Sequence, residues 1–89
     1  MSPDNIEQRL KTVLIDQLGF SLSPDRIHQE TTLYGKGLGL DSVDLVTLIA
    51  RLEEEFDIFF EPEEIGPSTQ NFGVLLQSVE KKLNGNGTH

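Results

Sequence analysis

The chain has 89 residues, no cysteine and a formal net charge of −8. A chain of this length can bury one small core but cannot form a catalytic cleft between two lobes, so we expect a single domain. The absence of cysteine excludes disulfides and thiolate metal sites, and any thiol chemistry would depend on an added group.

The negative charge is concentrated in residues 41–64, which hold nine acids and a single base, Arg51. The rest of the chain has six acids and six bases and is therefore neutral. Such an acidic region repels nucleic acid and anionic membranes, whereas it attracts a basic patch on a partner protein. We expect no nucleic-acid or membrane partner and interpret the acids as a docking surface; the alternative is a solvated surface that keeps the protein soluble.

The N-terminal segment predicts a helix and not a targeting signal. Residues 1–20 lack a basic start followed by a continuous apolar run, and no window approaches the roughly 18 apolar residues of a membrane span. We therefore expect a soluble, cytoplasmic protein. Ser2 and Pro3 suit a helix start, because proline at the first position gives up an N–H that had no partner. The helix is expected to end near Leu18, before Gly19, with a buried stripe of Ile6, Leu10, Val13, Leu14 and Leu18.

Residues 20–40 are long for a connection and are expected to be anchored in the core. Within them, residues 23–27 are interpreted as one helical turn. His28 has no companions at metal-ligand or base spacing, which indicates a solvated loop histidine. The glycine-rich residues 35–39 lack the spacing of a nucleotide-binding loop, so we expect them to turn the chain tightly into the next helix. The predicted anchors are Phe20, Leu22, Ile27 and Leu33.

Residues 43–56 predict a second helix, and its start carries the candidate functional residue. Asp41 is expected to be the N-cap, because its carboxylate can accept the unpaired N–H groups of the first turn. Ser42 then stands at about the first helical position, where the positive end of the helix dipole would stabilise a phosphate ester. No Gly-x-Ser-x-Gly motif or suitably placed histidine would activate this hydroxyl as a nucleophile. The apolar stripe of this helix is Leu45, Leu48, Ile49, Leu52 and Phe56.

After this helix, the apolar run of residues 58–60 is predicted to enter the core. Residues 61–65 then predict a short helical turn with Pro62 near its start. Gly66 and Pro67 are expected to end that turn, because both residues interrupt helices.

A last helix is predicted with Ser68 or Thr69 as its cap. Its buried stripe is Phe72, Leu75, Leu76, Val79 and Leu83. The glycine-rich residues 85–89 are expected to be a disordered tail, which leaves residues 1–84 as the domain. The predicted fold class is all-α, a small four-helix bundle of three longer helices and one short one, with a long loop between the first two helices.

The sequence around Ser42 resembles the acyl carrier protein family. Residues 39–46 read Gly-Leu-Asp-Ser-Val-Asp-Leu-Val, and residues 52–57 read Leu-Glu-Glu-Glu-Phe-Asp. The resemblance is strongest over residues 31–65, and the helix layout extends it over nearly the whole chain. It implies that Ser42 is the attachment point for 4′-phosphopantetheine, transferred from coenzyme A by a separate phosphopantetheinyl transferase.

The resemblance also implies the function and the partners. The chain would be a monomeric carrier, not an enzyme, that holds acyl groups as thioesters in fatty-acid, polyketide or related biosynthesis. Its partners would be synthases, acyltransferases or ligases with basic docking patches. Thr47, where many fatty-acid carriers have an acid, and Arg51, which is expected to put a positive charge on the otherwise acidic surface, depart from the family pattern on the face that would contact partners. The residues implied in partner contact are Asp41, Val43, Asp44, Ala50, Glu53 and Glu54.

Two alternatives stay open at this point. The first is an aminoacyl or peptidyl carrier, which would use the same arm. The second belongs to a different class: a small acidic helical adaptor that binds a basic protein with Ser42 unmodified. The apolar residues of the second helix also have two interpretations, namely ordinary core packing or a shelter for an acyl chain.

Overall fold

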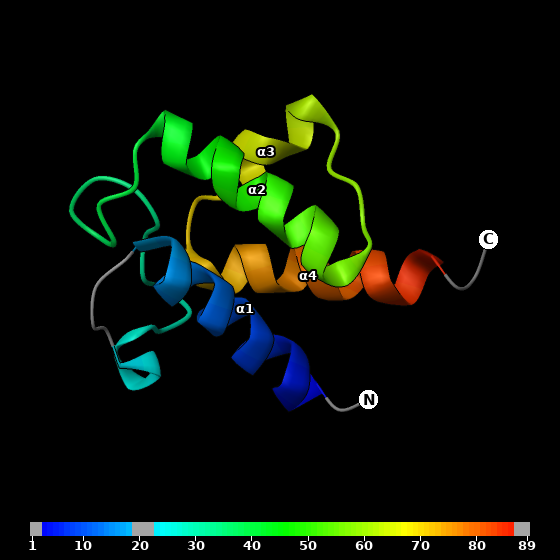
Figure 1. The fold of residues 1–89 in the computed structure, drawn as a ribbon, viewed down its shortest axis with the longest axis horizontal. Helices are drawn as coiled ribbons and strands as arrows, with labels where there is room; N and C mark the ends of the chain where they lie inside the picture. The colour runs from blue at the N-terminus through cyan, green and yellow to red at the C-terminus, as the bar shows by residue number, and fades with distance from the viewer. Residues whose placement is uncertain (1–2, 19–22, 87–89) are drawn as a thin grey trace.

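The computed structural model describes residues 3–18 and 23–86. In chain order the elements are α1 (Pro3–Leu18), the 3₁₀ turn η1 (Pro24–Arg26), α2 (Ser42–Phe56), α3 (Pro62–Ser68) and α4 (Phe72–Asn86), as Figure 1 shows. In these two ranges, β-pairing is limited to two isolated bridges. The all-α class, the three longer helices and one short helix, and the long first loop are therefore confirmed. No helix in the described ranges is long and apolar enough to cross a membrane.

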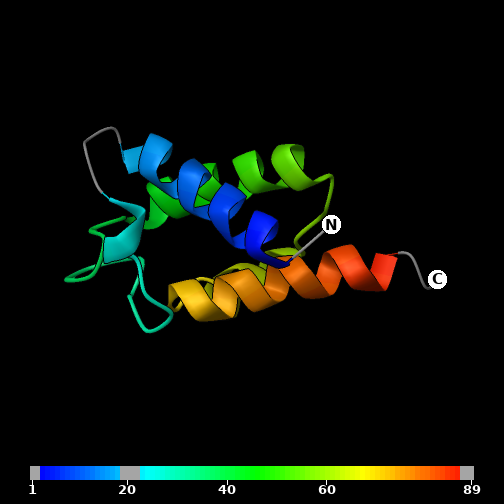
Figure 2. The ribbon, with the colours of Figure 1, turned by 90° about the horizontal axis from the view of Figure 1, so that it is seen from below.

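The helices pack in two layers around one core. Figure 2 shows α1 and α2 side by side, with α4 along the other side of the molecule. The connection between α1 and α2 lies at the end where α2 begins, and α4 ends at the opposite end (Figure 1). The predicted stripes supply most of the buried side chains: Leu10, Val13, Leu14, Leu48, Ile49, Leu52, Phe56, Phe72, Leu75, Leu76 and Val79. The predicted periodicity is thus what builds the core.

The connection between α2 and α3 corrects one prediction. Ile58 and Phe60 are buried, but Phe59 between them is 63% exposed. Burial alternates along residues 58–60, as it does where successive side chains point to opposite sides of the chain. Two of the three apolar residues therefore face the core and the third faces solvent.

The boundary between α3 and α4 also differs from the prediction. α3 continues through Gly66 and Pro67 to Ser68, because the Thr69 hydroxyl closes its last turn by donating to the carbonyl of Ile65 at 2.7 Å. Neither Ser68 nor Thr69 caps α4. Asn71 has that role instead, since its Oδ1 accepts the N–H of Val74 at 2.9 Å.

The ends of some predicted segments lie outside the described ranges. These are the cap at Ser2, the stop at Gly19, the anchors Phe20 and Leu22, and residues 87–89. α4 extends to Asn86, so residues 85 and 86 of the expected tail are helical. The division of the chain at residue 84 stays a prediction.

The loop before α2 is held by backbone hydrogen bonds and by buried anchors. Its predicted anchors Ile27 and Leu33 are buried, with 2% and 0% exposed. The N–H of Leu38 donates to the carbonyl of Thr32 at 2.9 Å, and the N–H of Leu40 donates to the carbonyl of Leu33 at 3.0 Å. Such bonds give the loop one defined path, which ends at the first residue of α2.

Three glycines permit this path, as predicted. Gly35 and Gly39 have φ values of +64° and +81°, a region that other residues rarely adopt. Gly37 is needed for space, because a Cβ on it would lie 1.9 Å from the carbonyl oxygen of Thr32. The loop backbone therefore approaches itself more closely than any side chain would allow.

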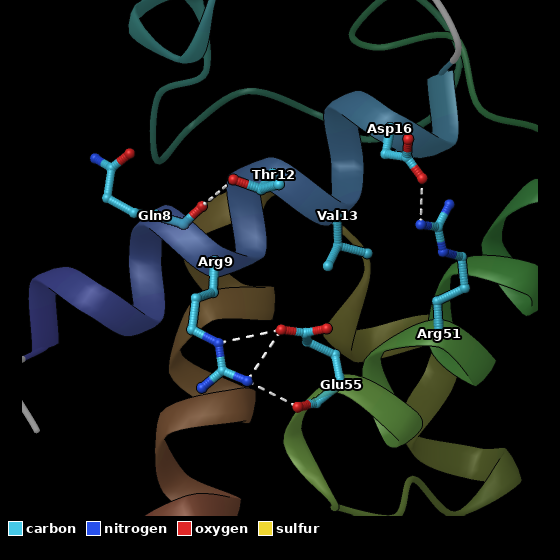
Figure 3. Close-up of a pocket in the computed structure, with 7 residues that line it drawn as sticks. All are labelled: Gln8, Arg9, Thr12, Val13, Asp16, Arg51 and Glu55. Atoms are coloured by element: carbon cyan, nitrogen blue, oxygen red, sulfur yellow. Dashed lines mark hydrogen bonds and ion pairs between the residues drawn. The ribbon is translucent and has the colours of Figure 1, made fainter.

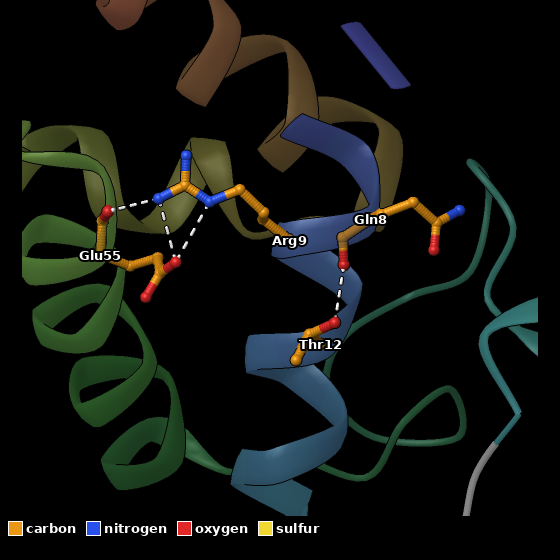
Figure 4. Close-up of polar contacts among 4 residues, drawn as sticks. All are labelled: Gln8, Arg9, Thr12 and Glu55. Atoms are coloured by element: carbon orange, nitrogen blue, oxygen red, sulfur yellow. Dashed lines mark hydrogen bonds and ion pairs between the residues drawn. The ribbon is translucent and has the colours of Figure 1, made fainter. Parts of the chain in front are cut away.

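Two ion pairs join α1 to α2 across a hollow of about 330 Å³ (Figure 3). Arg9 of α1 donates to the Glu55 carboxylate at 3.0 and 3.2 Å and to the Glu55 carbonyl at 2.8 Å, which Figure 4 shows as a fork around one residue. In the second pair the arginine comes from α2 instead: Arg51 of α2 pairs with Asp16 of α1. Each helix thus supplies one arginine and one acid to the contact.

Replacing Gly37 by alanine tests the close approach in the loop. Gly37→Ala should lower the free energy of unfolding by about 1 to 3 kcal/mol, because the added methyl group forces the backbone of Thr32 to move. The measurement is urea unfolding, read as a lower midpoint at an unchanged slope. Gly66→Ala is the matched control: its Cβ meets no atom within 4 Å, and alanine in a helix should raise stability by about 0.5 to 1 kcal/mol. Equal stability of Gly37→Ala and wild type would contradict the packing described.

The ion pair between α3 and α4 predicts a dependence of stability on pH. The Lys82 ammonium, 2.7 Å from the Glu64 carboxylate, lowers the pKa of Glu64 below its ordinary value of 4.5. The folded pKa is below the unfolded one, so the pair's contribution is present above pH 4.5 and is lost as the pH falls through the folded pKa. Urea unfolding should show a stability gap between wild type and Glu64→Gln at pH 7 that shrinks in acid. Glu63→Gln, which removes an exposed acid from the same helix, is the control, and a gap that stays constant would refute the assignment.

Candidate functional site

The predicted start of α2 is confirmed. Asp41 is the N-cap, and its Oδ1 accepts the N–H of Asp44 at 2.8 Å. The Asp44 carboxylate in turn accepts the N–H of Asp41 at 3.2 Å, which completes a capping box. Ser42 is the first helical residue and is exposed. Its hydroxyl is therefore presented to solvent at the N-terminus of a 15-residue helix.

Backbone donors and an apolar hollow surround Ser42. The N–H groups of Ser42 and Val43 belong to the first turn, where a helix offers no acceptor of its own. A hollow of about 420 Å³ opens beside the hydroxyl, where the loop, α2 and α3 meet. Its walls are mostly apolar, with glycine at two points of the rim. The lining residues are Tyr34, Gly35, Leu40, Asp41, Ser42, Leu45, Gly66 and Thr69. Sequence reasoning missed Tyr34 and Thr69 here, because they are distant from Ser42 in the chain.

The site has no geometry for catalysis or metal binding in the ranges that the structure covers. No group of three or more potential metal ligands is found among residues 3–18 and 23–86. His28 is exposed in the loop after η1, and its backbone N–H donates to the hydroxyl of Thr31 at 2.9 Å. The carboxylates beside Ser42, those of Asp41 and Asp44, already accept N–H groups in the capping box. The arrangement can therefore hold a group on the Ser42 oxygen, with these two carboxylates committed to the cap.

The outer side of α2 is partly apolar. Val43 is 71% exposed and Val46 is 60% exposed, while Thr47, Ala50 and Glu54 are also exposed. We call these five residues the exposed face of α2. Val43, Thr47, Ala50 and Glu54 were predicted for this face, but Val46 was missed. Its signal was present, since Val46 lies three residues after Val43 and off the buried stripe.

The acids predicted for partner contact fall into two groups. Glu53 is half-buried and its Oε2 accepts the N–H of Phe60 at 2.9 Å, so its carboxylate holds the connection to α3. Glu54 is exposed and makes no hydrogen bond or ion pair with the described residues. Asp41 is exposed and Asp44 is half-buried; both use their carboxylates in the capping box but remain beside Ser42.

The chain is similar to known proteins over most of its length. Residues 8–72 match the family model described as "Phosphopantetheine attachment site". An acyl carrier protein of Akkermansia muciniphila is 32% identical over 81 residues, which cover 91% of this chain and 96% of that protein. The family match covers more than half of the chain and includes the loop, α2 and α3.

The family implies 4′-phosphopantetheine as the prosthetic group, and the structure around Ser42 fits a group of this kind. Ser42, exposed at the first residue of α2, offers the point of attachment. The first-turn N–H groups would favour a phosphate on its oxygen, and the hollow could receive an apolar segment. Carriers of this family do not catalyse reactions themselves. The chain therefore belongs to the phosphopantetheine attachment site family and is a non-catalytic carrier protein similar to acyl carrier proteins.

Proposed function

We propose that this protein carries acyl intermediates as thioesters on a 4′-phosphopantetheine arm attached to Ser42, in fatty-acid, polyketide or related biosynthesis. The observation that carries the proposal is the position of Ser42, exposed at the first residue of α2. The similarity to an acyl carrier protein supports acyl cargo over an aminoacyl or peptidyl cargo. When bound, the group supplies a terminal thiol on a long arm.

Loading would take place on the Ser42 oxygen. In this step Ser42 Oγ forms a bond to the phosphorus that carries pantetheine in coenzyme A. The pyrophosphate bond breaks, adenosine 3′,5′-bisphosphate leaves, and the hydroxyl proton passes to the transferase or to water. The carrier only has to present its oxygen, because the separate transferase supplies the activation.

The helix end favours the product but cannot hold it without a covalent bond. An anion at an exposed helix N-terminus gains only about 0.3 to 1 kcal/mol from the helix dipole. The carboxylates of Asp41 and Asp44 lie beside Ser42 and oppose a phosphate by charge repulsion. Covalent attachment is therefore the form of binding that this site supports.

Partner enzymes would dock on the acidic and apolar side of α2. We propose contacts from Asp41, Val43, Asp44, Ala50 and Glu54, with Glu53 at the edge because its carboxylate already binds a backbone N–H. A basic patch on the transferase or on an acyl-processing enzyme complements these charges and would be steered toward Ser42. A monomer in the cytoplasm, with residues 1–84 as the carrier domain, completes the proposal.

Mass spectrometry tests the attachment. Incubation with coenzyme A and a broad-specificity phosphopantetheinyl transferase should raise the intact mass by one phosphopantetheine, and Ser42→Ala should abolish the rise because the accepting oxygen is gone. Ser68→Ala is the matched control, since Ser68 is buried in α3 and its loss should leave the rise in place.

An unchanged wild-type mass, under conditions that modify a known carrier, would contradict the proposal and favour the acidic adaptor with unmodified Ser42. Loading of the modified protein with acyl and aminoacyl donors then separates the two kinds of cargo. Exclusive loading with an aminoacyl group would favour the aminoacyl or peptidyl carrier.

A further inference from the structure

The base within the acidic segment, Arg51, is turned away from the exposed face of α2. Its guanidinium pairs with the Asp16 carboxylate and donates through Nη1 to Gln17 Oε1 at 3.2 Å. Figure 3 shows the side chain reaching across to α1. Arg51 follows Ala50 by one residue, so it leaves the helix about 100° around the axis from Ala50. Its charge is thus placed in the contact between α1 and α2.

We propose that Asp16 and Gln17 determine partner specificity by holding Arg51 on α1, which keeps positive charge off the exposed face of α2. The occupant of that face would be a partner protein with a basic docking patch. This inference rests on the proposed function, and it names α1 residues that do not belong to the docking helix itself. It also reverses the expectation from sequence, in which Arg51 lay on the acidic surface.

Glu54 is the acid that a released Arg51 would neutralise. It lies three residues after Arg51, a spacing at which side chains on one helix meet. Glu55, four residues after Arg51, is already bound by Arg9 of α1. Glu53 is bound by the N–H of Phe60. Glu54 therefore stays unpaired among the described residues only while α1 retains Arg51.

Releasing Arg51 should change the recognition of partners more than the stability of the fold. The side chains of Arg51 and Asp16 are 37% and 68% exposed, and ion pairs at such exposed sites contribute little to folding. A charge that moves onto a docking face, however, acts on an approaching partner within the Debye length, about 10 Å at 0.1 M salt. Changes of this kind act mainly on the rate of association.

A set of four variants tests the proposal. Asp16→Ala/Gln17→Ala releases Arg51, and Gln29→Ala/Glu30→Ala also removes one glutamine and one acid, from an exposed loop segment. The assay is kcat/KM for modification by a phosphopantetheinyl transferase with a basic docking patch, at low salt and coenzyme A in excess. The releasing variant should be about two- to five-fold slower than the loop control. Adding Arg51→Ala to it should restore the rate, high salt should close the gap, and Arg51→Ala alone should not slow the reaction.

A second measurement does not depend on the transferase. The carboxyl carbon signal of Glu54 should move in the nuclear magnetic resonance spectrum of the releasing variant, stay in place in the loop control, and return when Arg51→Ala is added. Thermal unfolding checks that each variant is folded.

The outcomes separate this inference from the proposed function. If wild type is modified but the releasing variant matches the loop control, or Arg51→Ala fails to restore the rate, the inference is overturned and the carrier function stands. A slower reaction of Arg51→Ala alone would also overturn it, because Arg51 would then contact the partner directly. If wild type is not modified, the proposed function fails, and an unmoved Glu54 signal rejects the placement of Arg51 independently.

Discussion

The placement of the Ser42 hydroxyl depends on the residue at which α2 begins. The capping box of Asp41 and Asp44, with N–H···O distances of 2.8 and 3.2 Å, makes Ser42 the first helical residue. The apolar stripe fixes the rotation of the helix separately, because its side chains must face the core. If the cap moved one residue toward the C-terminus while the stripe kept its place, Ser42 would become the N-cap, and its hydroxyl would accept an N–H of the first turn instead of standing free for attachment. Two independent constraints therefore present one hydroxyl to solvent.

The long connection before α2 is held in place by backbone hydrogen bonds and buried side chains. Its backbone bonds reach forward to the start of α4, where the N–H groups of Phe72 and Gly73 donate to the carbonyls of Thr31 and Gln29 at 2.9 and 2.8 Å. Leu40, directly before the cap, is 3% exposed. The end of the molecule that carries the candidate site thus joins the loop and the start of α2 to α3 and the start of α4, which come later in the chain. A small protein with one core can hold a rigid attachment point in this way without a second domain.

Local patterns predicted most of this fold, and the errors have physical causes. Helical periodicity and the Asp41 cap depend on residues within about one turn of each other, which a single sequence displays. Residues 58–60 are all apolar, and the sequence does not show that Phe59 is the one that faces solvent. At the end of α3, the hydroxyl of Thr69 closes the last turn although Gly66 and Pro67 are a local signal for a helix end. The partners of Arg51 and Glu53 are 35 and 7 residues away in the chain. The charges on α2 therefore predicted an acidic surface, but not which of these side chains form hydrogen bonds or ion pairs within the protein.

This division of charges separates stability from recognition. The free energy of folding comes mainly from the buried stripes, because burial of one large apolar side chain contributes about 1.5 to 3 kcal/mol and an exposed ion pair about 0.2 to 1 kcal/mol. The pairs Arg9–Glu55 and Arg51–Asp16 can thus change with little effect on the fold. Under the role proposed for Arg51, each such change redistributes charge along α2 and would alter which partner is attracted. One carrier fold can in this way serve different enzymes through substitutions at the contact between α1 and α2, without any change at the attachment residue.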